Sequence, residues 1–299
     1  MRVATRVPAI LVLLPALSAC LSRTLLAPTS APRDGVADSD PGPAAGDHDG
    51  NGNDNGGSDD PFCPAPISLA ALRCDLPVGP CARSPWCTGL VALYHFDNVA
   101  ADGESPTAVH DYSGRGSHLG CLAPDCPVPV TGVVDGGFAF ADPQYFAAPD
   151  QASLDSSDTV TVSAWFCPAA LTAGDWHVIV AKIQPTPLGS NFYLGHLGGQ
   201  LGVTFHDGVT WHNHLTASSY APGGWYHLVA VIDSVADRVR LYVNGDLALD
   251  DSETANMAVD DGSLWVGWGP GDLGVNGSID ELAIWGRALG DAEIAGLGW

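Results

Sequence analysis

The clearest structural signal in the sequence is Arg238-Val-Arg-Leu-Tyr-Val-Asn-Gly-Asp-Leu-Ala-Leu249. The Asn-Gly pair at its centre can supply the two positive φ angles that a type I′ turn requires. Val239, Leu241 and Val243 alternate with more polar residues, so their side chains should share one face of a strand. The stretch therefore predicts an antiparallel hairpin with one buried face.

The rest of the chain after residue 89 repeats this β pattern. Residues 160–166 and 178–182 are rich in β-branched and aromatic residues and are bounded by turn residues. Only the end of the chain favours a helix, where Gly290 can act as N-cap and Glu293 occupies the third helical position. Many short strands and one helical turn predict an all-β protein, an antiparallel β-sandwich of the jelly-roll kind.

The N-terminal third has a different composition. Residues 1–19 combine Arg2 and Arg6 with a short apolar run, as in a secretory signal peptide. Residues 20–61 consist mostly of Pro, Ala, Gly, Asp and Asn, and we expect a disordered acidic linker because such a segment buries too little apolar surface to offset its ordering entropy. Residues 62–88 form a Cys-rich collar, and residues 89–299 form the main domain.

The charge of the chain restricts its partners. It carries 34 acidic against 11 basic side chains, a formal net charge of −23. Nucleic acid is therefore excluded as a partner, because its phosphates attract basic surfaces. Calcium and neutral sugars are compatible with this surface.

The cysteines indicate an oxidising compartment. Cys121 and Cys126 are close enough in sequence to staple one loop. The collar contains four cysteines that we expect to pair among themselves, with three connectivities open. Their spacings lack the Cys-x-x-Cys pattern typical of zinc knuckles. Cys167 is then left over, either as a buried free thiol or as a competitor for a loop partner.

Two resemblances to known families extend this reading. Leu17-Ser-Ala-Cys20 resembles the lipobox of bacterial lipoproteins, which implies cleavage before Cys20 and acylation of that residue. Several acyl chains on one residue give durable membrane anchoring. Leu21 in place of Asp after the cysteine favours, by the same resemblance, the outer membrane of a Gram-negative cell, with the domain facing the periplasm or the cell surface.

The main domain resembles the LamG-like jelly-roll domains of the concanavalin A-like lectin/glucanase superfamily. Seven blocks in order carry the resemblance: residues 89–97, 111–114, 136–140 with 145–149, 160–165, 225–230, 240–245 and 277–289. One departure is Phe140-Ala-Asp142, where the family usually has Phe-Asp-Gly. The resemblance covers residues 89–299 and implies a jelly-roll with ligand-shaping loops.

The same resemblance implies a structural calcium ion that joins the first and last strands. By position, Asp97 and Asp280 are the side chains assigned to it, with backbone carbonyls around Gly136 and Gly137 as companions. Calcium takes six to eight oxygen ligands, which such segments can supply. The alternative is that both aspartates cap turns or pair with Arg287.

Further candidate residues lie between positions 211 and 268. His212 and His214 alternate on one strand face, a pattern that can bind a transition metal but is also typical of exposed histidines near a loop. Trp211 and the pair Trp265 and Trp268 are candidates for stacking on sugar rings, against the alternative of core packing.

No pattern for catalysis is present. Glucanases of this superfamily resemble one another in a Glu-x-Asp-x-x-Glu strand, because retaining hydrolysis needs two carboxylates about 5 Å apart. The four glutamates of the chain are scattered. We therefore expect a non-catalytic, envelope-anchored binding module for carbohydrate or a surface protein. A structural lipoprotein that docks a partner without sugar is the alternative, and a glycan hydrolase is a third class.

Overall fold

The computed structural model describes residues 72, 74, 85–184, 190–271 and 273–297. The predicted signal peptide, Cys20, the linker and most of the collar lie outside these residues. Among the described residues, no helix is both long and apolar enough to cross a membrane.

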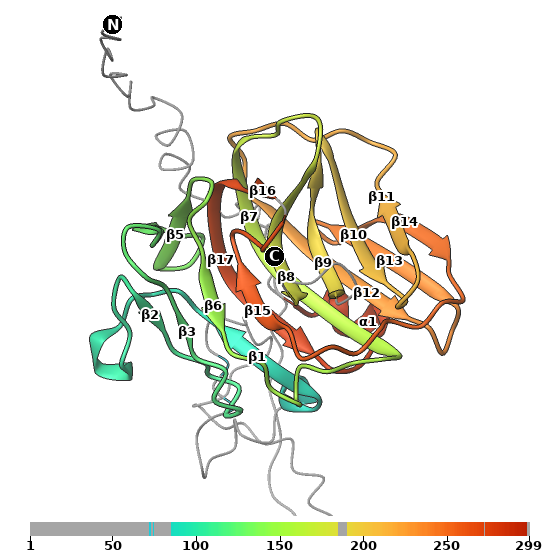
Figure 1. The fold of residues 1–299 in the computed structure, drawn as a ribbon, viewed down its shortest axis with the longest axis horizontal. Coiled ribbons are helices and arrows are strands. Elements are labelled where there is room, and N and C mark those ends of the chain that lie inside the picture. The colour runs from blue at the N-terminus through green and yellow to red at the C-terminus, as the bar shows by residue number, and fades with distance from the viewer. Residues whose placement is uncertain (1–71, 73, 75–84, 185–189, 272, 298–299) are drawn as a thin grey trace, which may run out of the picture.

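The described residues fold into two β-sheets that pack face to face, as predicted (Figure 1). The first sheet has eight strands, and β17 at its centre pairs with β7, β5 and β1. In spatial order its strands are β14 (Asp246–Ser252), β13 (Arg238–Val243), β12 (Tyr226–Asp233), β7 (Thr159–Ala170), β17 (Asn276–Trp285), β5 (Gly136–Phe140) and β4 (Val128–Thr131), with β1 (Leu90–Tyr94) also on β17.

The second sheet has nine strands in the described residues. In spatial order they are β11 (Trp211–Leu215), β10 (Gln200–His206), β9 (Ser190–Leu197), β8 (Trp176–Ile183), β15 (Ser263–Val266), β6 (Phe146–Ala148), β3 (Leu119–Gly120) and β2 (Ala108–Val109), with β16 (Leu273–Gly274) beside β8. Its pairs are antiparallel except for β16 with β8. Two short 3-10 helices, Pro85–Cys87 and Ala100–Asp102, flank β1.

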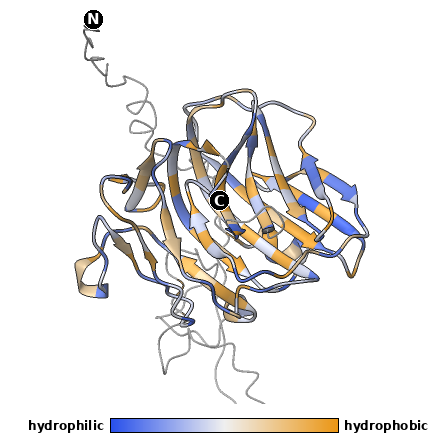
Figure 2. Ribbon diagram, viewed as in Figure 1, coloured by the Kyte–Doolittle hydropathy of each residue, from blue (hydrophilic) through white to orange (hydrophobic). Residues whose placement is uncertain are grey.

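The predicted hairpin is β13 and β14. Asn244 and Gly245 have φ angles of 50° and 84°, as the type I′ turn requires. Val239, Leu241 and Val243 are buried in the main core between the sheets. Figure 2 shows many apolar residues in the central strands of both sheets, whereas the edge strands β11 and β14 are largely hydrophilic.

A second apolar cluster covers the outer side of the first sheet. The helix α1 (Asp291–Ala295) contributes Ile294, and the collar contributes Leu72. Beneath them lie Leu93, Val229 and Trp285, all buried. The predicted cap is present, since the Glu293 carboxylate accepts a hydrogen bond from the backbone N–H of Gly290 at 3.0 Å. We call this side of the first sheet the covered face.

Two complete disulfides lie within the described residues. Cys121 pairs with Cys126, as predicted, and Cys74 pairs with Cys87 within the collar. Cys167, buried in β7, is also disulfide-bonded. The alternative of a buried free thiol at Cys167 is therefore wrong. This bond was not predicted, because nothing near Cys167 along the chain indicates its partner.

Candidate functional site

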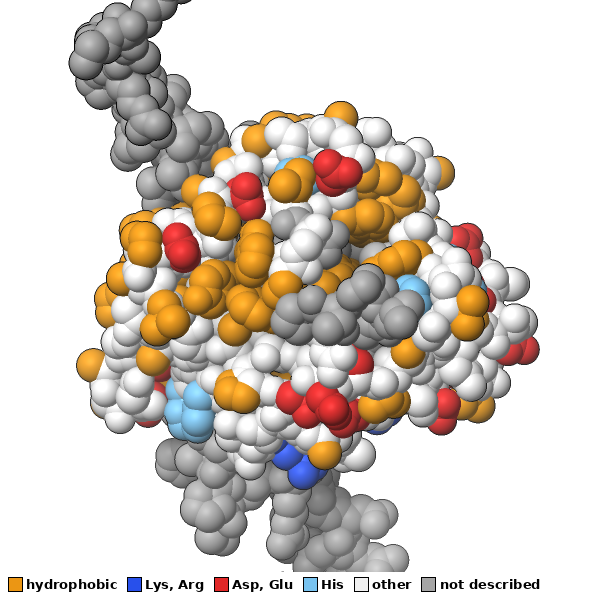
Figure 3. Space-filling view, in the orientation of Figure 1, with side chains coloured by type: hydrophobic (Ala, Val, Ile, Leu, Met, Phe, Trp, Pro, Cys, Tyr) orange, Lys and Arg blue, Asp and Glu red, His pale blue; other side chains and the backbone are white. Residues whose placement is uncertain are grey.

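The outer side of the second sheet carries a groove lined by aromatic and polar side chains. Strands β8 to β11 contribute its five lining residues, and its volume is about 240 Å³. We call this side of the second sheet the open face. Figure 3 shows it, with apolar side chains gathered around a central hollow. The lining residues of the groove are Trp176, Tyr193, Thr204, Trp211 and Asn213.

Trp176 forms the floor of the groove. Its half-buried indole extends over β9 and β10, where two directly paired glycines, Gly195 and Gly202, leave room for the ring. A Cβ atom at Gly202 would lie 2.9 Å from Cη2 of Trp176, and one at Gly195 would lie 3.6 Å from Cε3. Since both ends of the six-membered ring meet a glycine, the indole lies across the strands and leaves its other side toward the groove.

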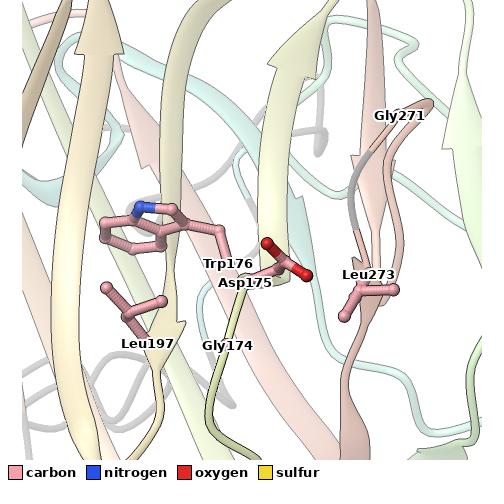
Figure 4. A pocket seen from close by; sticks show the side chains of 6 residues that line it. All are labelled: Gly174, Asp175, Trp176, Leu197, Gly271 and Leu273. Atoms are coloured by element: carbon pink, nitrogen blue, oxygen red, sulfur yellow. The ribbon is translucent and has the colours of Figure 1, made fainter.

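A second hollow of about 470 Å³ is also lined by Trp176. Asp175 and Leu273 line it together with Leu197. Figure 4 shows the Trp176 ring beside Leu197 at one end, Leu273 at the other end, and the Asp175 carboxylate between them. Asp175 is exposed and is the one carboxylate among the described residues that line the two hollows. The groove offers a mainly apolar surface with the polar side chains of Thr204 and Asn213, which is typical of small-ligand sites.

Trp265 and Trp268 form a second aromatic group with Tyr145. The ring centroid of Trp265 lies 5.2 Å from that of Tyr145 and 5.5 Å from that of Trp268. Trp265 packs on Tyr193 and its apolar neighbours on the outer side of β8 and β9, so it belongs to the open face. The structure therefore places the predicted residues Trp211 and Trp265 on one side of one sheet, with Trp268 in contact with the second of them.

Trp176 and Tyr193 were missed by the sequence analysis. Trp176 follows a Gly-Asp turn, a position that does not by itself indicate an exposed ring. The usable signal is the pair of glycines, Gly195 and Gly202, placed symmetrically about the β9–β10 turn at Gly198 and Gly199. Two strands that lack side chains at paired positions indicate that a large group from elsewhere lies over them.

His212 and His214 share one side of β11, as their spacing predicts, but it is the inner side. His212 stacks on Phe205 with centroids 4.9 Å apart, and its ring nitrogens contact Glu253 at 2.8 Å and Asp207 at 3.1 Å. Partial burial alone would lower the pKa of His212, but these carboxylates raise it above its usual value. His214 contacts the Asp251 carboxylate at 2.9 Å. The two histidines thus join β11 to the edge strand β14.

Asp97 and Asp280 lie around the loop that precedes β5. Asp280 is fully buried, and its Oδ2 accepts hydrogen bonds from the backbone N–H groups of Val133 at 2.8 Å and Val134 at 3.1 Å. Its Oδ1 accepts one from Glu281 at 2.8 Å. Burial first, and then the Glu281 carboxylate, raise the pKa of Asp280 well above its usual value. Asp280 therefore holds this loop against β17.

Asp97 is less committed to hydrogen bonds. Its Oδ1 accepts the backbone N–H of Gly136 at 3.0 Å, and it lines a shallow hollow of about 380 Å³ with Asp135 and Gly137. Arg287, the alternative partner, contacts Glu293 at 2.7 Å. Among the described residues, no group of three or more His, Cys, Asp or Glu side chains has the geometry of a metal site. Backbone oxygens would have to complete a calcium shell here.

Comparison with known proteins shows what the fold is similar to. No curated protein sequence matches the chain significantly. The binding domain of Paraclostridial Mosquitocidal Protein 1 aligns with a TM-score of 0.55 and 16% identity, over 70% of this chain and 51% of that domain. This chain thus spans about half the length of that relative. The botulinum neurotoxin serotype G binding domain aligns with a TM-score of 0.54 and 13% identity, over 70% and 50%.

Domain 4 of AbnA, an extracellular arabinanase from Geobacillus stearothermophilus, was solved in complex with arabinotriose. It aligns with a TM-score of 0.54 and 21% identity, over 70% of this chain and 98% of that domain. These likenesses show the fold. A family model described as the concanavalin A-like lectin/glucanases superfamily matches residues 140–295, just over half of the chain. The chain belongs to this superfamily.

Proposed function

We propose that this chain is a non-catalytic binding module that recognises neutral carbohydrate on its open face. The observation that carries the proposal is the Trp176 indole, which lies across Gly195 and Gly202 and presents one side to a groove. A flat aromatic surface suits the apolar side of a sugar ring. Polar groups beside it fix the orientation of a ligand, and here Thr204 and Asn213 can supply hydrogen bonds.

The charge and the lining of the groove favour a neutral ligand and binding without catalysis. The chain carries a net charge of −23, and Asp175 adds a carboxylate beside Trp176. An acidic polymer would meet repulsion from both. Retaining glycoside hydrolysis uses two carboxylates about 5 Å apart, whereas Asp175 is the one carboxylate among the described residues that line the two hollows.

The test is a glycan array probed with the wild-type chain, followed by titration of the hits. Trp176→Ala should weaken binding at least about tenfold, which corresponds to about 1.4 kcal/mol. Trp165→Ala is the matched control, because Trp165 is also half-buried but stacks on His227 at the outer side of the first sheet. Equal binding by Trp176→Ala and wild type would refute the site. If no glycan on the array binds and an envelope protein co-purifies with the chain, the alternative of a structural lipoprotein that docks a partner protein would be favoured instead.

We further propose that Cys20 is acylated and holds the module at the outer membrane. The support is the lipobox-like Leu17-Ser-Ala-Cys20 after an apolar run. Cys20→Ser should leave the precursor uncleaved and remove the protein from the detergent-soluble lipoprotein fraction. Cell fractionation and mass spectrometry measure both outcomes. Normal processing of the Cys20→Ser variant would contradict the anchor.

A calcium ion beside Asp97 and Asp280 is the third proposal. Its support is the crowding of acidic groups: burial raises the pKa of Glu281, and the nearby carboxylates of Asp97 and Asp135 raise it further, although His95 opposes them. A cation would relieve this repulsion. Elemental analysis of the purified chain and its melting temperature with and without a chelator test the proposal. Absence of metal and an unchanged melting temperature would refute it, and Asp97→Asn should abolish any effect of the chelator.

A further inference from the structure

Lys182 in β8 has a fully buried side chain whose ammonium group sits among five oxygen atoms. Nζ lies 2.8 Å from Oδ1 of Asp150, 3.0 Å from Oδ1 of Asp155 and 3.3 Å from Oδ1 of Asp260. It also lies 2.9 Å from each of the backbone carbonyl oxygens of Asp260 and Gly262. The oxygens come from two segments that are far apart in the sequence, residues 150–155 and 260–262. We call this group of five oxygens the Lys182 cage.

The cage supplies more oxygen and more negative charge than one ammonium group can satisfy. An ammonium has three N–H donors, so at least two of the five close oxygens are held by charge attraction alone. Three carboxylates face a single positive charge. In addition, Oδ2 of Asp260 is buried and has no hydrogen-bond partner among the described residues, although the Asp260 side chain is only 4% exposed. Such a set of carboxylate and carbonyl oxygens is what a hard divalent cation prefers.

We propose that the Lys182 ammonium is an internal cation in a calcium-type site, and that truncation of this side chain opens a site for Ca²⁺. The five oxygens, together with Oδ2 of Asp260 and water in the vacated space, provide the six to eight ligands that calcium takes. Calcium binds oxygen at about 2.3–2.6 Å, so the oxygens of the cage must move inward by roughly half an ångström. The loops that bear Asp150 and Asp155 can follow, because these side chains are still partly exposed.

The ammonium remains charged at neutral pH. Burial alone would lower the pKa of Lys182, but the hydrogen bonds and charges of Asp150, Asp155 and Asp260 raise it above its usual value. Among the described residues, no other Lys or Arg forms an ion pair with these carboxylates. The lysine therefore supplies the one permanent positive charge that holds these segments together.

The cage lies directly behind the open face. Gly262 precedes β15, which carries Trp265, and its close approach to β8 leaves no room for a side chain: a Cβ would lie 2.3 Å from the carbonyl carbon of Ile183. The buried Asn191 side chain joins the same two loops by donating to the carbonyl oxygens of Ser156 and Ala258, each at 2.7 Å. Because Asn191 provides a second connection between these loops, we expect the fold to tolerate the loss of the Lys182 side chain.

The test compares Lys182→Ala with Lys182→Met in the full chain. Alanine leaves the cage open, whereas methionine has nearly the length of lysine and fills it with apolar atoms. Both variants also carry Asp97→Asn, as does the reference chain, so that any calcium effect at Asp97 is removed from all three. Thermal unfolding and calorimetric titration are recorded with CaCl₂ and with MgCl₂.

We expect calcium at about a hundred times its dissociation constant to raise the melting temperature of Lys182→Ala by roughly 5–10 °C. Lys182→Met and the reference should not respond, and Mg²⁺ should act weakly because it demands a small octahedral shell. If Lys182→Ala is unfolded without metal, calcium should restore its near-ultraviolet circular dichroism. No calcium response in Lys182→Ala, or an equal response in Lys182→Met, would overturn the proposal.

Discussion

The two outer sides of the sandwich use large aromatic residues in opposite ways. On the covered face, Trp285 is fully buried, and its indole N–H donates to the carbonyl oxygen of Trp86 at 2.8 Å. On the open face, Trp176 lies over two glycines and lines a groove. Both residues point away from the core between the sheets. Strand alternation thus places an aromatic ring on the outer side of a sheet. The segments that pack over the ring then decide whether it stabilises the fold or is free to bind a ligand.

The largest expected effect is on the covered face. Trp285→Ala should destabilise the domain by about 3–5 kcal/mol, because it leaves a cavity under the helix and the collar. Trp211→Ala on the open face should cost less than about 1 kcal/mol, since Trp211 is already 42% exposed. Urea unfolding followed by circular dichroism measures both. Similar losses in the two variants would break the distinction between the faces.

Gly202→Ala should have an intermediate effect that links packing to binding. A Cβ there would lie 2.9 Å from Cη2 of Trp176 and 2.6 Å from the carbonyl oxygen of His214. We expect a loss of about 1–3 kcal/mol from overpacking, together with displacement of the indole and weaker glycan binding. Gly224→Ala is the control, because a Cβ at Gly224 meets nothing within 4 Å. Unfolding curves and tryptophan fluorescence measure these changes. The prediction would be wrong if both variants gave the same curves and spectra as the wild-type protein.

A pH dependence should arise on the outer side of the first sheet. Burial lowers the pKa of His227 to about 3, from 6.5 for the free side chain. The unfolded chain therefore takes up a proton between pH 6.5 and 3 that the folded chain excludes, so His227 costs stability as the pH falls through this range. The loss is about 1.4 kcal/mol per pH unit. His227→Gln should show a shallower decline of the urea midpoint between pH 7 and 4, and parallel curves would contradict the assignment.

The smallest expected effect concerns Asp175 on the open face. Asp175→Asn should change the free energy of unfolding by no more than about 0.5 kcal/mol, because the side chain is exposed. Affinity for a neutral glycan should stay within about threefold, while binding of acidic glycans should increase at low salt. Asp246→Asn is the matched control, an equal charge change on β14 of the other sheet. A glycan array at two salt concentrations separates the variants.

Much of the fold followed from local patterns. The β13–β14 hairpin depends on the Asn-Gly pair at its turn, and α1 depends on Gly290 and Glu293, which are three residues apart. Each feature can be read from a short window. The alternation at His212 and His214 was also read correctly, but alternation does not say which side faces the core. The side of β11 that faces the core depends on the acidic partners of the two histidines. Two of these partners, Asp251 and Glu253, lie on or just after β14, about forty residues further along the chain.

The site was predictable only in part, because its main features are long-range. Trp211, Trp265 and Trp268 were identified as aromatic candidates outside the family blocks, and they lie on or beside the open face. Trp176 depends on two glycines that become neighbours only when β9 pairs with β10. The partners of Lys182 lie at positions 150, 155 and 260, and no sequence window contains them together.

The collar has a consequence for how the domain is displayed. The backbone N–H of Cys74 donates to the carbonyl oxygen of Tyr112 at 3.0 Å, and Leu72 is buried in the covered face. The polypeptide therefore enters the domain from behind the first sheet, on the side away from the groove. A tether attached upstream would hold the module by its back and turn its aromatic surface outward. Many copies on one surface would then present parallel grooves, an arrangement suited to multivalent attachment to a repetitive polymer.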